Sequence, residues 1–188
     1  MKAQQLGQSD VVRLVRASQA GEKAAFDKLV RLYQRQAMRV ALGILGEAND
    51  AAEAVQEGFV KAYLNIRQLK YPRRFRLWLL KIVTNAAVGQ QRAARRRAEI
   101  LKAVRSSRAR REVLRPIDTE AVKDLKRAVQ QAMVQLTEKE AKAITLFGLE
   151  DLGQDEVAEI MGCSAEAVRW HVYRARQKLK VWLKEYLQ

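Results

Sequence analysis

The side chains best suited to binding chemistry gather in one stretch of the 188-residue chain, between residues 164 and 183. They are cationic or aromatic: Arg169, Trp170, Tyr173, Arg174, Arg176 and Lys178. Arginine can form two parallel hydrogen bonds with guanine, and aromatic rings can pack against sugars or thymine methyl groups. These residue types therefore indicate a surface that binds DNA. The alternative is a solvated basic face, on which two large aromatic side chains are unfavourable.

The apolar residues of the same stretch predict the helix that positions these side chains. They recur at steps of four and three, at Val168, Val172, Ala175, Leu179 and Trp182. That spacing places them on one stripe of a helix. A short amphipathic segment precedes it at residues 155–161, where Gly162 can end one helix and Ser164 can cap the next. The pattern predicts a helix-turn-helix, whose second helix enters the DNA major groove.

The charge balance points to a polyanionic partner. Lys and Arg number 36 against 21 Asp and Glu, which gives a net charge of +15. This excess favours nucleic acid or an anionic membrane surface. No apolar run reaches membrane-spanning length, and residues 1–10 do not resemble a signal peptide. We therefore expect a soluble, cytoplasmic protein without membrane insertion.

Groups that could carry catalysis are scarce. The chain has one His, one Cys, no glycine-rich phosphate loop and no clustered metal ligands. An enzyme is therefore the weakest interpretation, and we expect no cofactor and no metal. His171 borders the apolar stripe without an expected titratable neighbour, which favours a structural role over a pH switch. Cys163 is expected to be a small buried apolar residue and not a redox sensor.

Composition and helix signals predict an all-helical protein. Gly and Pro number only nine and two, while good helix formers are abundant. Asp50–Glu53 and Thr137–Glu140 have the pattern of capping boxes that open helices. Pro72 breaks the chain, and residues 75–86 then show the clearest helical period. A basic stretch with few bulky apolar residues separates the predicted domains, which span residues 1–97 and 118–188 around a linker at 98–117.

Two further polar surfaces belong to the first predicted domain. An acidic stripe faces outward from the helix that starts near residue 50, at Asp50, Glu53, Gln56 and Glu57. Taken alone, it is best interpreted as a solvated face. A second set is mainly cationic: Lys70, Arg73, Arg74, Arg76, Asn85, Arg92, Arg95 and Arg96. Asn85 could bond a base or cap its helix, and Trp78 is favoured as a core residue over a stacking platform for a base.

Three blocks of sequence resemble one known family. Residues 50–63 read DAAEAVQEGFVKAY, residues 75–85 read FRLWLLKIVTN, and residues 154–179 end in RARQKL. In this order they are similar to regions 2.2, 2.3 to 2.4 and 4.2 of the sigma-70 family of bacterial sigma factors. The compact extracytoplasmic-function (ECF) class, which keeps only regions 2 and 4, is the nearest match. Ala52, Ala54 and Gly89 depart from the family pattern.

The resemblance implies an all-α fold of two small helical domains, a region 2 bundle and a region 4 helix-turn-helix, joined by a flexible basic linker. It implies a transcription initiation factor that binds core RNA polymerase and directs it to promoters through their −10 and −35 elements. Core RNA polymerase and promoter DNA are the implied partners, and an anti-sigma factor is a further partner that the class allows. The alternative is a conventional helix-turn-helix regulator that acts without replacing the sigma subunit.

The resemblance also assigns roles to the three surfaces. It assigns the acidic stripe to the clamp helices of core polymerase. The set from Lys70 to Arg96 is assigned to the −10 element, where Arg92, Arg95 and Arg96 are expected to contact phosphates more than bases. The set from Arg169 to Lys178 is assigned to the −35 element.

Overall fold

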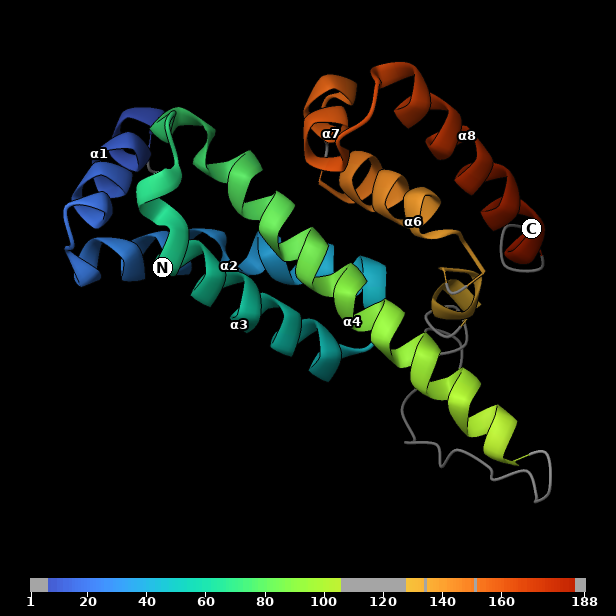
Figure 1. Ribbon diagram of the computed structural model, residues 1–188. Coiled ribbons are helices and arrows are strands. Elements are labelled where there is room, and N and C mark those ends of the chain that lie inside the picture. Colours follow the sequence, from blue (N-terminus) through green and yellow to red (C-terminus); the bar gives the residue numbers. More distant parts are fainter. Residues whose placement is uncertain (1–6, 106–127, 134, 151, 185–188) are drawn as a thin grey trace, which may run out of the picture.

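The computed structural model describes residues 7–105, 128–133, 135–150 and 152–184, and all regular structure in these ranges is helical (Figure 1). The N-terminal half contains α1 (Gln8–Gln19), α2 (Lys23–Leu45), α3 (Ala48–Asn65), η1 (Ile66–Gln68), η2 (Pro72–Arg74) and α4 (Phe75–Arg105). The C-terminal half contains a helical segment at 128–133, α6 (Glu138–Ile144), η3 (Thr145–Leu149), α7 (Gln154–Met161) and α8 (Ala165–Trp182). The predicted all-α fold is confirmed.

The helix boundaries follow from local capping. Thr137 and Glu140 form the predicted capping box, in which the Thr137 N–H donates to the Glu140 carboxylate at 2.9 Å. The predicted box at Asp50 is wrong, because Glu47 caps α3 and its carboxylate accepts from the backbone N–H groups of Asn49 and Asp50. Asp50 instead lies in the first turn of α3, where a negative charge is favourable next to the helix N-terminus.

The N-terminal half is held together by apolar packing between α2, α3 and α4. Leu29, Phe75 and Leu79 are completely buried there. Burying one such side chain contributes roughly 1.5–3 kcal/mol. Gly58 allows α3 to approach α4, because a Cβ atom at this position would lie 2.8 Å from Cγ2 of Val83. This half therefore has a core that can position a site on its surface.

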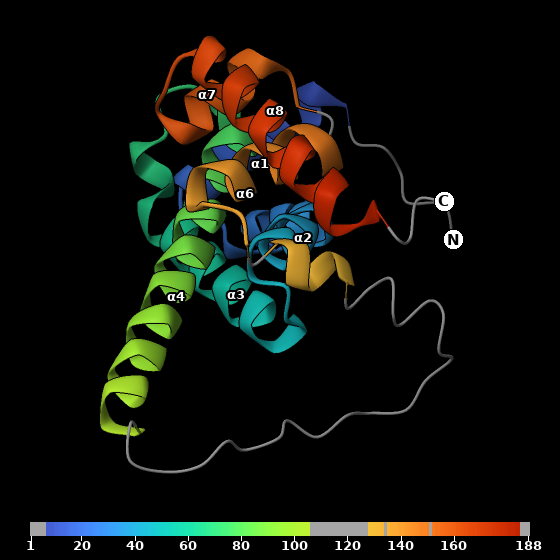
Figure 2. The ribbon, with the colours of Figure 1, turned by 90° about the vertical axis from the view of Figure 1, so that its right-hand side faces the viewer.

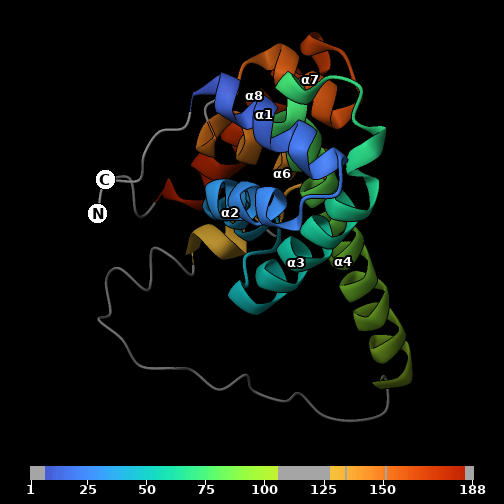
Figure 3. The same ribbon diagram turned by 90° about the vertical axis from the view of Figure 1, so that its left-hand side faces the viewer.

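The two halves lie against each other along α2 and α4. The apolar cluster of the N-terminal half continues into the C-terminal half through Leu146, Leu152, Val157 and Ile160. In Figure 1, α7 lies beside the first turns of α4, and α2 contacts η3. Figures 2 and 3 both show the last turns of α4 extending beyond the other helices. The described halves thus form one packed unit.

The end of α4 can be compared with the predicted boundary between the first domain and the linker. This helix runs without interruption through residue 105, so residues 98–105 of the predicted linker are helical. The rest of that linker lies outside the described residues, and the domain limits stay a prediction. None of the helices in the described ranges is long and apolar enough to cross a lipid bilayer.

Candidate nucleic-acid interface

The predicted helix-turn-helix is present as α7 and α8. Gly162 ends α7 with a positive φ of 67°, which favours glycine. The Ser164 hydroxyl then accepts from the Ala167 N–H at 3.2 Å and caps α8. Val168, Val172 and Ala175 are buried as predicted, whereas Trp182 is 56% exposed. Trp182 was predicted on the apolar stripe, so the buried part of this stripe ends before it.

The six predicted contact residues of α8 form two parallel ridges. Arg169, Tyr173 and Arg176 follow each other along one exposed ridge, as their spacing of four and three requires. Trp170, Arg174 and Lys178 follow the second ridge at steps of four. On this second ridge the guanidinium carbon of Arg174 lies 5.3 Å from the centre of the Trp170 ring, within the range of a cation–π interaction.

Glu140 of α6 ties the second ridge to the domain, a role that the sequence analysis missed. Its carboxylate is 2.6 Å from Nζ of Lys178 and 3.8 Å from Nε of Arg174. Burial opposes the charged form of Glu140, but the hydrogen bonds from Lys178 and Thr137 prevail and lower its pKa. Glu140 was identified only as part of a capping box, because a partner 38 residues away leaves no local signal.

The first ridge faces a small hollow instead. Phe147, Gln154, Val168, Arg169, Val172, Tyr173 and Arg176 line a pocket of about 210 Å³. The guanidinium carbon of Arg176 lies 5.7 Å from the centre of the Phe147 ring. The Arg169 side chain forms an exposed ion pair at 3.3 Å with Glu166, one turn earlier. Because an exposed ion pair is weak, Arg169 can exchange Glu166 for another anion.

Two predictions about the turn and the recognition helix are wrong. Cys163 is exposed and not buried, since it follows Gly162 at the outside of the turn. His171 has titratable neighbours after all. Burial, together with the charge of Lys139, lowers the His171 pKa, while Glu140 raises it. Its Nδ1 atom is buried with no hydrogen-bond partner among the described residues.

The eight predicted basic and amide residues of the N-terminal half do not form one compact cluster. Lys70, Arg73 and Arg74 surround a hollow of about 750 Å³ near η2, which Arg16 and Tyr71 also line. Arg92, Arg95 and Arg96 lie farther along α4, about five helical turns from Arg74. The set therefore divides into a group near η2 and a group near the middle of α4.

Three single residues of this region have clear positions. Asn85 is exposed in the interior of α4, so the alternative that it caps the helix is wrong. Trp78 is half-buried, with its ring centre 6.0 Å from that of Phe75, as a residue at the edge of the core would be. Tyr71, which the sequence analysis did not select, is 69% exposed beside Lys70.

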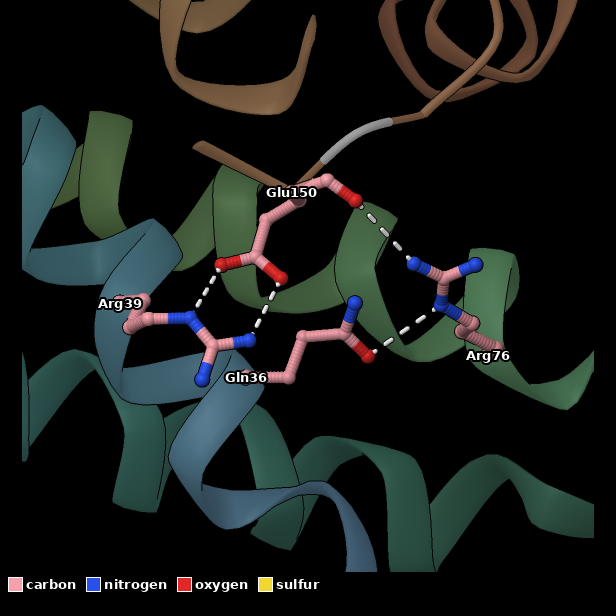
Figure 4. A network of polar contacts seen from close by, with 4 residues as sticks. All are labelled: Gln36, Arg39, Arg76 and Glu150. Atoms are coloured by element: carbon pink, nitrogen blue, oxygen red, sulfur yellow. Dashed lines mark hydrogen bonds and ion pairs between the residues drawn. The ribbon is translucent and has the colours of Figure 1, made fainter. Parts of the chain in front are cut away.

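Arg76 points toward the C-terminal half. It donates to the side-chain oxygen of Gln36 at 3.3 Å and to the backbone carbonyl of Glu150 at 3.4 Å (Figure 4). Next to it, Arg39 of α2 forms two parallel hydrogen bonds with the Glu150 carboxylate at 2.8 and 2.9 Å. Arg76 therefore takes part in the contact between the halves.

The acidic stripe lies on the outer face of α3, as predicted. Asp50, Glu53 and Gln56 are exposed, and Glu57 is half-buried beside Lys61, one turn later. Two exposed apolar residues, Val60 and Leu64, follow the acidic stripe along α3 toward the C-terminus of this helix. A surface that combines carboxylates with apolar side chains suits a protein partner better than DNA.

Comparisons with known proteins assign both halves to one family. Residues 29–97 match the model of sigma-70 region 2, and residues 126–179 match the model of sigma-70 region 4. The ECF RNA polymerase sigma-E factor of Haemophilus influenzae is 33% identical over 174 residues, which cover 89% of this chain and 92% of the relative. The RNA polymerase sigma-H factor of Pseudomonas aeruginosa is 29% identical over 181 residues, or 93% of this chain and 94% of the relative. The chain belongs to the ECF sigma factors.

Two solved structures share the fold of this sigma factor. CnrH, solved in complex with the cytosolic domain of CnrY, has a TM-score of 0.71 at 24% identity and covers 94% of this chain and 98% of its own. RpoE of Bartonella quintana, solved with the anti-sigma factor NepR, has a TM-score of 0.63 at 22% identity. It covers 85% of this chain and 96% of its own.

Membership of the family decides between the two functions left open by the sequence. A conventional regulator would leave the N-terminal half without a role, whereas this half matches sigma region 2. The relatives are sigma factors along nearly the whole chain. The protein is therefore a transcription initiation factor, and sigma factors bind core RNA polymerase and promoter DNA.

Proposed function

We propose that this sigma factor binds core RNA polymerase through the outer face of α3 and reads promoters through η2, α4 and α8. The observation that carries the proposal is the separation of three exposed surfaces by charge. Asp50, Glu53 and Gln56 lie on an outward face of α3, while the cationic residues lie on other elements. One protein can then hold polymerase and DNA without either partner covering the site of the other. Glu57 and the nearby Val60 complete the proposed polymerase contact.

The hollow near η2 is the proposed site at which the −10 element is opened. Melting requires that a base leaves the stack, and the protein must offer it a stacking surface and cations for its phosphate. Tyr71 is exposed between Lys70 and Arg73 and can supply the stacking surface, which leaves Trp78 in the core. Arg74, which lines the same hollow, and the nearby Arg76 are proposed to contact the same element. Asn85, Arg92, Arg95 and Arg96 are proposed to follow the DNA along α4.

The −35 element is proposed to contact both ridges of α8. Arg169 lies nearest the N-terminus of α8, the part of a recognition helix that meets base edges, and Tyr173 follows one turn later on the same ridge. Trp170 and Arg174 are held as a stacked pair, which fixes the direction of the arginine. Arg176 is proposed to contact the DNA backbone. Lys178 is proposed to act there only weakly, because its ammonium group is bound to Glu140.

We also propose that the sigma factor acts in the cytoplasm and is not an enzyme. It requires no cofactor, and an anti-sigma factor can be one of its partners. Support for such a partner is that RpoE of Bartonella quintana was solved with the anti-sigma factor NepR.

Run-off transcription with core polymerase on a library of genomic fragments tests the function. The protein should direct initiation at a small set of promoters that share two elements at fixed spacing. Arg169→Ala should weaken use of the matching promoters by about 1–3 kcal/mol and relax base preference at one −35 position. Tight sequence-specific DNA binding by the protein alone, with no fragment transcribed, would instead indicate a conventional regulator.

A pull-down with core polymerase tests the acidic face separately. The double variant Asp50→Lys with Glu53→Lys should lose core binding but keep the fold, since both side chains are exposed. Glu22→Lys with Asp27→Lys, at exposed positions near the start of α2, serves as a control of equal charge change. Undiminished retention of the α3 variant would refute the assignment of this face.

A further inference from the structure

One side of the hollow near η2 comes from α1, a helix that the proposed function does not use. Val12 and Arg16 lie one turn apart on α1 and line the hollow opposite the chain from Lys70 to Arg74. In Figure 1, α1 lies beside η2, and the two elements are in contact. The match to sigma-70 region 2 begins at residue 29, so α1 precedes the matched part of the chain.

We propose that α1 forms one side of the −10 site and supplies two residues to it. Arg16 contacts the phosphate next to the base that leaves the stack, and Gln19 positions the loop that carries Tyr71. The inference rests on the proposed function, because it concerns the same −10 site. Arg16 is a DNA-contact residue, whereas Gln19 acts through Tyr71 and does not touch DNA.

The charge of the hollow favours a phosphate beside Arg16. The charged residues that line the hollow are all cationic: Arg16, Lys70, Arg73 and Arg74. Arg74 is paired with Glu159 of α7, at 2.7 Å between Nη1 and Oε2. Arg16, in contrast, is exposed and forms no ion pair with any described residue. Its guanidinium is therefore available to a phosphate, which can accept two parallel hydrogen bonds from arginine.

The size and the apolar part of the hollow suit a single nucleotide. Its volume of about 750 Å³ falls within the range of about 300–1,000 Å³ that is usual for small-ligand sites. Val12 and Pro72 are half-buried and line the hollow together with Tyr71, which is 69% exposed. A captured base needs an aromatic face and apolar surroundings, and its phosphate needs a cation. From α1, Val12 serves the base and Arg16 serves the phosphate.

Gln19 connects α1 to the chain that leads to Tyr71. Its side-chain nitrogen Nε2 donates to the backbone carbonyl of Ile66 at 3.0 Å and to that of Leu69 at 2.9 Å. Ile66 begins η1 and Leu69 follows its end, so the two hydrogen bonds hold η1 at both ends. An amide group has two N–H donors, and Gln19 uses both of them here. The position of this loop therefore depends on one side chain of α1.

The backbone at Tyr71 has little freedom left. Pro72 follows it, and a residue before proline is restricted to extended conformations. Tyr71 accordingly has a φ of −116° and a ψ of 94°, and its carbonyl accepts from the Arg74 N–H at 2.9 Å. On its other side, Leu69 is buried and bonded to Gln19. A stacking residue that is held on both sides has less entropy to lose when it binds a base.

Binding of premelted promoter DNA tests the role of Arg16. The DNA is a fragment that the wild-type protein transcribes in the run-off experiment, with its −10 element made single-stranded, and the protein is used with core polymerase. Arg16→Ala should weaken binding about three- to tenfold, as expected for one lost hydrogen bond to a charged group. The plot of log K against log salt should become shallower by about 0.7, because one phosphate contact of a single strand is lost.

Arg13→Ala is the matched control for Arg16→Ala. It removes the same charge from α1, at an exposed position that does not line the hollow. It should leave both the affinity and the salt dependence nearly unchanged. Equal losses in the two variants, or undiminished binding by Arg16→Ala, would overturn the assignment of Arg16.

A double-mutant cycle tests whether Gln19 acts through Tyr71. Opening of the same promoter as a duplex is followed by the fluorescence of 2-aminopurine placed in the −10 element. Gln19→Ala should reduce opening about three- to tenfold, because two hydrogen bonds to the loop are lost. In a Tyr71→Ala background the same change should have less than about a twofold effect, since the residue that it positions is gone. A folding defect would reduce opening equally in both backgrounds, and that result would overturn the positioning role.

The wild-type protein separates failure of this inference from failure of the proposed function. If the wild type opens no promoter together with core polymerase, the proposed function is wrong, and the inference falls with it. If the wild type opens a promoter, and the Arg16 and Gln19 variants open it equally well, only the inference is wrong.

Discussion

Two helix contacts in this protein depend on glycine, and they are otherwise opposite in character. Gly58 brings α3 against Val83 of α4, inside the apolar core of the N-terminal half. Gly43 brings α2 against Thr145 and Leu149 of η3, where the two halves meet. The first contact is surrounded by completely buried aliphatic residues. The second lies beside the Arg39–Glu150 ion pair, whose arginine is 56% exposed.

The difference lies in what surrounds each glycine. Apolar packing alone holds α3 against α4, so this contact depends on the exclusion of water. The contact between the halves combines the Arg39–Glu150 ion pair with buried apolar residues such as Leu146 and Leu152. Glycine thus allows a close approach both inside the N-terminal core and where the two halves meet.

Removing buried apolar atoms should destabilise the core of the N-terminal half most severely. Leu79→Ala should lower the free energy of unfolding by about 2–5 kcal/mol, because it leaves a cavity at a completely buried position. Leu64→Ala, at a side chain that is 72% exposed, is the control and should change stability by less than about 0.5 kcal/mol. Urea unfolding followed by circular dichroism measures both. Similar losses in the two variants would contradict the placement of the core.

Replacing a glycine by alanine should change the stability of the protein according to the space around that glycine. Gly58→Ala should destabilise the protein by about 1–3 kcal/mol, because Val83 and the α4 backbone leave no room for it. Gly89→Ala is the matched control in α4, since nothing described lies within 4 Å of its added Cβ. It should stabilise the protein by about 0.5–1 kcal/mol through better helix propensity. Thermal unfolding should therefore shift in opposite directions for the two variants.

Neutralising the buried glutamate of region 4 should have a smaller effect. Glu140→Gln keeps a side chain that can complete the capping box with Thr137 but removes the charge that holds Lys178. We expect a loss of about 1–2 kcal/mol, as for a hydrogen bond to a charged group. Because Arg174 also loses its anchor, use of promoters with altered −35 elements should broaden. Run-off transcription on −35 variants measures this effect, and an unchanged preference would contradict it.

The smallest expected effect is a pH dependence due to His171. Its pKa is lowered in the folded protein, mainly by burial, from an ordinary value of 6.5. The unfolded chain then binds more protons than the folded one as the pH falls below 6.5, so stability should decline in that range. The contribution is complete above pH 6.5. In His171→Asn the melting temperature should change less between pH 7.5 and pH 5.5 than in the wild type.

Patterns of short range predicted much of the fold and of the recognition helix. The steps of four and three from Val168 to Ala175 identified the buried face of α8, and Gly162 and Ser164 marked its start. The same kind of evidence misplaced the cap of α3. Glu47 and Asp50 are both acidic and lie within one turn of the helix start, and only the backbone geometry decides between them.

Contacts between distant residues could not be predicted, because helical periodicity carries no information about which faces meet. Arg39 and Glu150 are 111 residues apart, and nothing near either residue signals their pairing. Arg76 was predicted to contact DNA, and its hydrogen bonds to Gln36 and to the backbone carbonyl of Glu150 could not be predicted. The assignments to polymerase and promoter stay predictions, since they concern partners and not the chain itself.

Gly43 carries an evolutionary consequence. Alanine at this position would favour the helix α2 but would collide with Thr145 where the two halves pack together. The packing of the halves therefore favours glycine, whereas a relative without this contact would gain helix stability from alanine. Substitutions at position 43 should then occur together with smaller residues at position 145, or with the loss of the Arg39–Glu150 pair. Aligned sequences of relatives would thus show, at one helix position, which of them keep this contact.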